Sequence, residues 1–263
     1  MPARFHVAQA LRPGLPLDLP DSAARHVQVL RLQPGAAITL FDGSGGQWQA
    51  EVLAIGRKTV TARVLVFDPQ ERELATAVTL AVGMPANERM DGLVEKATEL
   101  GVAAVQPLVC ERSVLRLGDE RAQRKAAHWQ AIAAAACEQS GRNRVPHIAA
   151  PLPLRAWLAA LQAPAPNLLN RQPWLPAQRR WMLSLAHDAL PLGRALGGAV
   201  ATATVLSGPE GGLSPDEASA AQAAGFVPLS LGPRTLRADT APLAALACIA
   251  TLAGIATLEN TAG

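Results

Sequence analysis

Several residue types are scarce in this sequence, and each scarcity argues against a class of protein. Aromatic residues make up 3% of the 263 residues and tyrosine is absent, which disfavours a nucleic-acid binder built on stacked aromatic rings. Cys110, Cys137 and Cys248 lie far apart and form no CxxC pair, so neither a disulfide scaffold nor a cysteine-based zinc site is expected. The five histidines never fall at metal-ligand spacings, and no metal site is predicted.

Charge and long apolar runs are limited as well. A net charge of +3 allows an anionic partner without demanding one. The first residues lack the apolar core of a signal peptide and the cysteines fit a reducing compartment, so a cytoplasmic location is expected. The uncharged stretch 240–258 is long enough to cross a bilayer, but its Ala, Thr and Gly content favours a helix buried against protein. No membrane contact is therefore expected.

The first 71 residues predict a small β domain. Segments 37–41, 47–55 and 59–66 alternate in part between apolar and polar residues and are separated by turn signals. With a helical turn at 22–31, they indicate an antiparallel barrel or sandwich. The polar segment 68–73 contains a proline and is predicted to link this domain to the next.

After this segment the pattern changes to alternating strands and helices. We expect strands at 77–83, 103–109, 167–169, 180–186, 203–207 and 227–231, and helices at 88–100, 119–139, 214–224 and 239–258. Such alternation predicts a parallel α/β sheet that is covered by helices on both faces.

Two loops that follow predicted strands carry the candidate chemistry. They read Ser207-Gly-Pro-Glu-Gly-Gly212 and Leu231-Gly-Pro-Arg-Thr-Leu-Arg237. Ligands of open α/β sheets bind beyond the carboxyl ends of the strands, so a shared pocket is favoured over two plain turns. The helix after the first loop opens with the capping box Ser214-Pro-Asp-Glu217. Its two carboxylates disfavour a phosphate at that helix end and leave a neutral or cationic ligand.

A third polar cluster, Arg142-Asn-Arg-Val-Pro146, follows the predicted long helix. Its arginines fit two interpretations equally well. They are either cations that complement the C-terminal end of the helix dipole, or part of a loop that faces RNA or closes a pocket.

Four ordered motifs resemble the bacterial 16S rRNA uridine-N3 methyltransferases of the RsmE family, in the SPOUT superfamily. The resemblance covers nearly the whole chain, including Val29-Leu-Arg31 and Phe41-Asp-Gly-Ser44 in the β region. The motifs are Glu88-Arg-Met-Asp91 with residues 94–101, the segment 136–146, and the two Gly-Pro loops. The resemblance implies an α/β protein with an N-terminal, RNA-binding PUA-like β-barrel in residues 1–71. A SPOUT methyltransferase domain with a C-terminal trefoil knot would follow in residues 72–263.

The resemblance also implies an activity and its residues. The cofactor is S-adenosylmethionine, the substrate is N3 of a specific uridine in 16S rRNA of the small ribosomal subunit, and the protein is a homodimer. Catalytic roles fall to Arg237 and Arg142, and RNA contacts to Arg4, Arg31 and Arg144. The implied cofactor contacts are Gly208, Glu210, Gly211, Gly212, Leu231, Gly232, Arg234 and Leu236.

One departure from the family and two alternatives accompany this interpretation. Ala238-Asp239 stands where the family commonly has Thr-Glu, which keeps a carboxylate but shortens its reach. The glycine loops alone fit a ribose 2′-O methyltransferase of the same architecture equally well. A non-catalytic RNA-binding factor of ribosome assembly is the alternative from another class.

The final helix is the expected dimer contact. Its lack of charge marks no face for water, and small residues allow close approach of a second copy about a two-fold axis. Helical spacing predicts one face on the protein's own sheet, made of Leu243, Leu246, Ala247 and Ala250. The residues predicted to point elsewhere are Ala244, Thr251 and Ile255.

Overall fold

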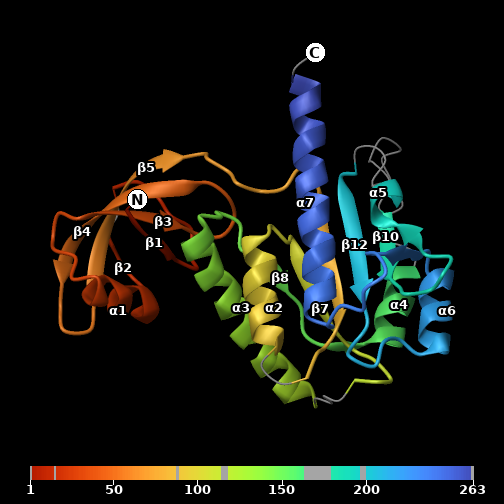
Figure 1. The fold of residues 1–263 in the computed structure, drawn as a ribbon. Coiled ribbons are helices and arrows are strands. Elements are labelled where there is room, and N and C mark those ends of the chain that lie inside the picture. Colours follow the sequence, from red (N-terminus) through yellow and green to blue (C-terminus); the bar gives the residue numbers. More distant parts are fainter. Residues whose placement is uncertain are drawn as a thin grey trace. The chain divides into compact units, whose positions relative to one another are not determined.

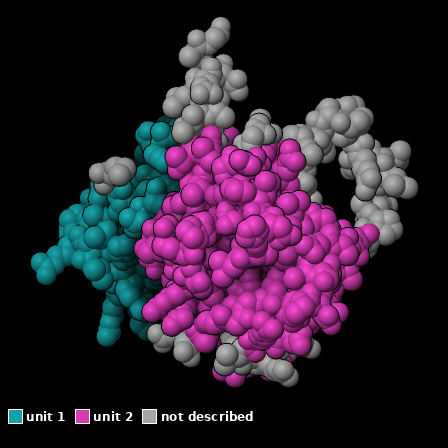
Figure 2. Space-filling model, turned by 45° about the vertical axis from the view of Figure 1, so that its right-hand side comes forward, with its two compact units in different colours: residues 1–73, 133–145 teal, residues 74–132, 146–263 magenta. Residues whose placement is uncertain are grey.

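The computed structural model describes residues 2–14, 16–86, 89–113, 118–162, 179–195 and 200–261, without the side chains of residues 119 and 253–261. The chain forms two compact units, coloured separately in Figure 2. The first contains residues 1–73 and 133–145, and the second contains residues 74–132 and 146–263. Helix α3 (Asp119–Ser140) contributes its residues 133–140 to the first unit. The strand predicted at 167–169 lies outside the described residues.

The first unit is built on a five-stranded sheet in the order β1-β3-β4-β5-β2. Its elements are β1 (Ala3–His6), β2 (Pro16–Asp18), α1 (Asp21–Val29), β3 (Ala37–Phe41), β4 (Gln47–Ile55) and β5 (Val60–Asp68). The three central strands and the helical turn lie where the sequence predicts them. The prediction of a purely antiparallel sheet is wrong, because β1 pairs with β3 in parallel. The sequence missed β1 and β2 because three or four residues are too few to show a period.

The core of this unit lies between α1 and the sheet. The helix buries Ala23, Ala24 and Val27, which share one face at helical spacing. They belong to the same buried cluster as Phe5 and Leu40, which lie opposite each other on β1 and β3.

The second unit holds an eight-stranded sheet in the order β11-β13-β10-β12-β6-β7-β8, with β9 also paired to β7. In the part of the chain that the structure describes, all strand pairs of this sheet are parallel, as the alternation of strands and helices predicts. Its strands are β6 (Ala77–Gly83), β7 (Ala104–Val109), β8 (His147–Ile148), β9 (Leu152–Pro153), β10 (Arg179–Leu183), β11 (Leu190–Pro191), β12 (Thr202–Ser207) and β13 (Val227–Ser230). Its other helices are α2 (Arg89–Glu99), α4 (Leu154–Gln162), α5 (Leu192–Ala195), α6 (Pro215–Ala223) and α7 (Thr240–Thr261).

Helices cover both faces of this sheet (Figure 1). Helices α4 and α6 contact each other and share a buried cluster with Ala81 and Leu206, which are register partners on β6 and β12. The preceding residues of the two strands, Leu80 and Val205, are also partners and point to the opposite face. Helix α7 contacts β6 and β12 and lies against α2.

The inward face of α7 differs from the predicted one. Its buried side chains include Ala245, Leu246 and Ile249, so only Leu246 of the predicted set is buried. The other predicted inward residues are partly buried, namely Leu243, Ala247 and Ala250. The sequence misplaces the face because an uncharged helix of small apolar residues is nearly uniform around its axis. Within the described residues, no helix is both long and apolar enough to cross a membrane.

Candidate active site

The two Gly-Pro loops meet at one edge of the sheet in the second unit. The first follows β12 and the second follows β13, and both strands are direct neighbours of β10. Because parallel strands end at the same edge, the two loops open on the same side, beside Leu183 and Ser184 at the end of β10. They enclose a cavity of about 790 Å³. The shared pocket that the sequence predicts is therefore present.

The cavity gathers the residues that the sequence assigns to cofactor binding. All eight of them line it, namely Gly208, Glu210, Gly211, Gly212, Leu231, Gly232, Arg234 and Leu236. Arg237, a predicted catalytic residue, lines the same cavity, and both Arg234 and Arg237 are exposed. Asp239, the residue at which the sequence predicts a shortened carboxylate, is partly buried just before α7.

Close backbone contacts fix the shape of the first loop. A Cβ atom at Gly208 would lie 2.8 Å from the backbone nitrogen of Leu213, which leaves room for hydrogen only. A Cβ at Gly83, the last residue of β6, would lie 2.6 Å from the nitrogen of Pro209. Gly212 has a φ of +68° and donates a hydrogen bond from its backbone to Pro209 O (2.8 Å). The backbone of the loop therefore packs directly against the end of β6, and the loop forms a tight turn.

The acidic side chains around the loop accept hydrogen bonds from backbone N–H groups. The Glu210 carboxylate accepts a hydrogen bond from Ala86 N (2.9 Å) and lies 3.5 Å from Arg89 Nη1. Glu217 is buried and accepts from Ser214 N (2.9 Å) and from Glu111 N (2.7 Å). Ser214 Oγ in turn accepts from Glu217 N (3.2 Å), which confirms the predicted capping box. Glu217 thus joins the start of α6 to the loop after β7.

The loop after β7 is a part of the site that the sequence reasoning missed. Arg112 Nη1 donates to Gly211 O (2.9 Å), and a Cβ at Gly211 would lie 3.1 Å from Arg112 Cβ. Both residues follow strands at the same edge, so the rule that selected the Gly-Pro loops also applies here. The sequence does not reveal that β7 lies close to β12 in the sheet order.

A buried thiol beside the loop is not reactive at neutral pH. Cys110 Sγ lies 3.0 Å from the position that a Cβ of Gly83 would occupy. Burial, and after it the nearby Glu217 carboxylate, raises the pKa of the Cys110 thiol to about 12. The thiol is therefore protonated at neutral pH and is not a thiolate nucleophile. No metal-binding cluster of His, Cys, Asp and Glu occurs among the described residues.

The predicted RNA-contacting residues lie in the first unit. Arg4 donates to Asn143 Oδ1 (2.7 Å) and Arg142 O (3.2 Å), and its guanidinium lies 5.0 Å from the centre of the Phe41 ring. Partial burial lowers the pKa of Arg4 from its usual high value. Arg31 is exposed just after α1, with a left-handed φ of 53° that is usual for glycine at a helix end.

The cluster at 142–144 separates into a buried and an exposed arginine. Arg142, the second predicted catalytic residue, is only 3% exposed and forms an ion pair with Glu73. Arg144 keeps 55% of its side chain exposed and pairs with Glu71 at 3.1 Å. The structure brings Arg4, Arg142 and Arg144 together within the first unit, while Arg237 belongs to the second.

Comparisons with known proteins give the class of this chain. Residues 72–250 match the family model of an RNA methyltransferase domain, and residues 19–65 match that of an RNA methyltransferase PUA domain. A solved structure of ribosomal RNA small subunit methyltransferase E from Neisseria gonorrhoeae, bound to S-adenosyl methionine, is similar with a TM-score of 0.83 and 35% identity. It covers 96% of this chain and 98% of its own. The chain is thus a PUA-containing RNA methyltransferase.

Curated relatives give the family more narrowly. Ribosomal RNA small subunit methyltransferase E of Synechocystis is 38% identical over 229 residues, covering 84% of this chain and 68% of the relative. The Bacillus subtilis protein of the same name is 31% identical, covering 85% and 84% of the two chains. This chain belongs to the ribosomal RNA small subunit methyltransferase E family. The family and fold class that the motifs indicate are confirmed, and the trefoil knot stays a prediction.

The capping contacts of Glu217 yield a stability prediction. Replacing Glu217 by Ala removes the acceptor of the buried Ser214 N–H and of the partly buried Glu111 N–H, and we expect the free energy of unfolding to fall by about 2 kcal/mol. Asp216→Ala is the matched control, because that side chain is 84% exposed and its pairing with Arg155 is long, at 3.8 Å. It should change stability by less than about 0.5 kcal/mol. Urea unfolding measures both, and equal losses would contradict the assignment.

Proposed function

We propose that this protein transfers the methyl group of S-adenosylmethionine to N3 of a specific uridine in 16S rRNA of the small ribosomal subunit. The observation that carries the proposal is the cavity that both Gly-Pro loops enclose, lined by every residue implied for the cofactor. The similar protein from Neisseria gonorrhoeae, and one from Legionella pneumophila with 30% identity and a TM-score of 0.83, are solved with this cofactor bound. The choice of uridine N3 rests on the motif resemblance.

The residues of the cavity fit such a cofactor. Gly208 and Gly212 let backbone groups approach a ligand closely, and Leu231 and Leu236 supply apolar walls. The carboxylates of Asp216 and Glu217 at the start of α6 disfavour a phosphate and tolerate a cationic sulfonium. When bound, the cofactor supplies a methyl group that is already activated for displacement.

The contribution of the protein is therefore orientation and electrostatics. Target N3 lies on the pairing edge of uracil, so the base must be unpaired or flipped into the cavity. Arg237 is exposed and lines the cavity, where its guanidinium stabilises the negative charge that develops on the uracil oxygens as the N3 proton leaves. Holding the base in line with the methyl group supplies much of the rate.

The first unit supplies the RNA contacts in this proposal. The domain assigned to residues 1–71 exposes Arg31 to solvent. Arg4 of this domain donates a hydrogen bond to Asn143, and Arg144 forms an ion pair with Glu71. Arg142 is buried against Glu73, which favours a positioning role for this arginine over direct contact with the base. The three unpaired cysteines are typical of a reducing compartment, and we place the reaction in the cytoplasm.

Methyl transfer to small subunits tests the function directly. Purified protein with methyl-labelled S-adenosylmethionine should label small ribosomal subunits or 16S rRNA, and nucleoside mass spectrometry should identify 3-methyluridine. A label on ribose 2′-O would assign the protein to the other chemistry of this architecture. Absence of label with retained RNA binding would indicate an assembly factor instead.

A glycine substitution tests the cofactor site. Gly208→Ala places a Cβ 2.8 Å from a backbone nitrogen, so the loop must shift, and we expect cofactor affinity to fall at least about tenfold. Gly92→Ala on α2 is the matched control, because nothing lies within 4 Å of its Cβ, and it should retain wild-type affinity. Titration calorimetry measures both variants. Wild-type affinity in a folded Gly208→Ala protein would refute the pocket assignment.

We also propose a homodimer in which α7 forms part of the interface. This helix carries no charge from Thr240 to Leu258, and it exposes Cys248, Thr251 and Leu252. Light scattering at low micromolar concentration should give twice the 27.4 kDa mass of the chain. Thr251→Arg should shift the population toward monomer, since it introduces a like charge on both copies. An active monomer of the wild-type chain would contradict the proposal.

A further inference from the structure

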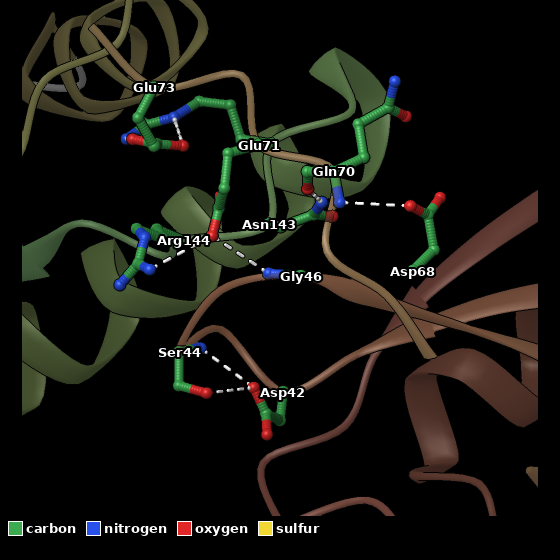
Figure 3. A network of polar contacts seen from close by, with 10 residues as sticks. Asp42, Ser44, Gly46, Asp68, Gln70, Glu71, Glu73, Asn143 and Arg144 are labelled. Carbon is green, nitrogen blue, oxygen red and sulfur yellow. Dashed lines mark hydrogen bonds and ion pairs between the residues drawn. The ribbon is translucent and has the colours of Figure 1, made fainter. Parts of the chain in front are cut away.

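One carboxylate in the first unit occupies a position typical of a bound anion. Glu71 Oε1 accepts a hydrogen bond from Gly46 N (3.0 Å) and lies 3.1 Å from Arg144 Nη2 (Figure 3). A backbone N–H and a guanidinium that converge on one oxygen are the donors with which proteins hold phosphate and carboxylate groups. The anion held here belongs to the protein itself.

Glycine makes room for this ion pair. Gly45 has a φ of +122°, and a Cβ on it would lie 2.4 Å from Glu71 Oε1 and 2.5 Å from Arg144 Nη2. Any larger residue would therefore push both charged groups away from the backbone. The neighbouring Gly43 and Gly46 also have positive φ angles, so their N–H groups need not follow the alternating directions of a strand.

The glycine turn 43–46 and Arg144 form a cradle around the Glu71 carboxylate, and contacts that do not involve Glu71 hold both parts in place. Asp42 Oδ1 accepts from Ser44 N (2.9 Å) and Ser44 Oγ (2.6 Å), which fixes the glycine turn. Ser44 forms an isolated antiparallel bridge with Arg144, and Val145 N donates to Gly43 O (3.1 Å). The position of the arginine beside the turn is therefore set by backbone pairing, which does not depend on Glu71.

The bound carboxylate is open to exchange. The side chain of Glu71 is 33% exposed and that of Arg144 is 55% exposed, in contrast to the buried Arg142 of the same loop. An exposed ion pair contributes little to stability because water and salt compete with it. An external oxyanion of similar geometry can thus replace Glu71 without unfolding the cradle.

We propose that Gly46 N–H and Arg144 form a phosphate site for the RNA backbone, and that Glu71 fills this site when RNA is absent. The identity of the ligand as RNA rests on the proposed function. Binding exchanges one carboxylate for one phosphate, so Glu71 acts as an internal competitor. Glu71 therefore weakens the binding of any RNA at this site. It favours substrates whose other contacts with the protein hold a phosphate beside Gly46 and Arg144, because such a phosphate displaces the carboxylate more easily. Glu71 is thereby a specificity-determining residue.

Neutralising the competitor tests the proposal. Glu71→Gln should tighten binding of both 16S rRNA and an unrelated single-stranded RNA by about two- to fivefold, measured without cofactor. The relative gain should be larger for the unrelated RNA. Glu51→Gln on β4 is the matched control, because it removes the same charge from the same unit away from the cradle. An equal gain in RNA affinity from Glu51→Gln would show that the effect comes from the change in net charge, and it would overturn the proposal.

The arginine supplies the second half of the test. Arg144→Gln should weaken RNA binding and lower the slope of log affinity against log salt by about 0.7 to 0.9, the share of one phosphate. In the Arg144→Gln background, Glu71→Gln should bring no further gain. A full gain in that background would show that Glu71 does not act through Arg144.

Two further measurements keep the outcome interpretable. Thermal melting checks that each variant folds, and Glu71→Asp, whose shorter carboxylate withdraws from Gly46, should give an intermediate affinity if Glu71→Gln is unstable. Methyl transfer is measured separately. RNA binding that tightens in Glu71→Gln without any methylation would overturn the proposed function and support this inference. Wild-type methylation with unchanged RNA affinity in a folded Glu71→Gln protein would overturn this inference alone.

Discussion

The order of strands around β10 is the constraint on which the site depends. Because β12 and β13 both pair with β10 in parallel, the loops that leave them open at one edge and enclose one cavity. The first loop can occupy this edge only because β6 ends in Gly83, whose missing side chain admits Pro209. Glu217 and Arg112 then tie the loop to its neighbours from two sides. The cavity is thus shaped by backbone contacts before any ligand enters.

Charge is distributed differently in the two units. In the second unit, the carboxylate of Glu217 is turned to backbone donors, while Arg234 and Arg237 are exposed around the cavity. In the first unit, the arginines at 142 and 144 each face a glutamate. Burial divides that pair into a structural anchor at Arg142 and an exchangeable contact at Arg144. One sequence motif therefore contains two different physical roles.

Features encoded by short-range physics were predictable. The capping box at Ser214 needs residues three positions apart, and the glycine turns need only the residues of the loop itself. Features that depend on distant pairing were not. The segment 68–73 has the composition of a linker, yet Gln70, Glu71 and Glu73 contact residues of the loop 142–144, about seventy positions away. The parallel pairing of β1 with β3 and the inward face of α7 escaped prediction for the same reason.

The sequence alone determined the family, the two Gly-Pro loops and the candidate residues around them, because ordered motifs and turn chemistry are local properties of the chain. It also established that the strands and helices alternate, which places ligand-binding loops at the carboxyl ends of strands. Tertiary structure alone decided that Arg142 is buried, that Arg144 forms an ion pair with Glu71, and that Arg112 donates a hydrogen bond to Gly211 O. The physical reason is that burial and the partner of a charge depend on which segments meet in space, and spacing along the chain does not specify this.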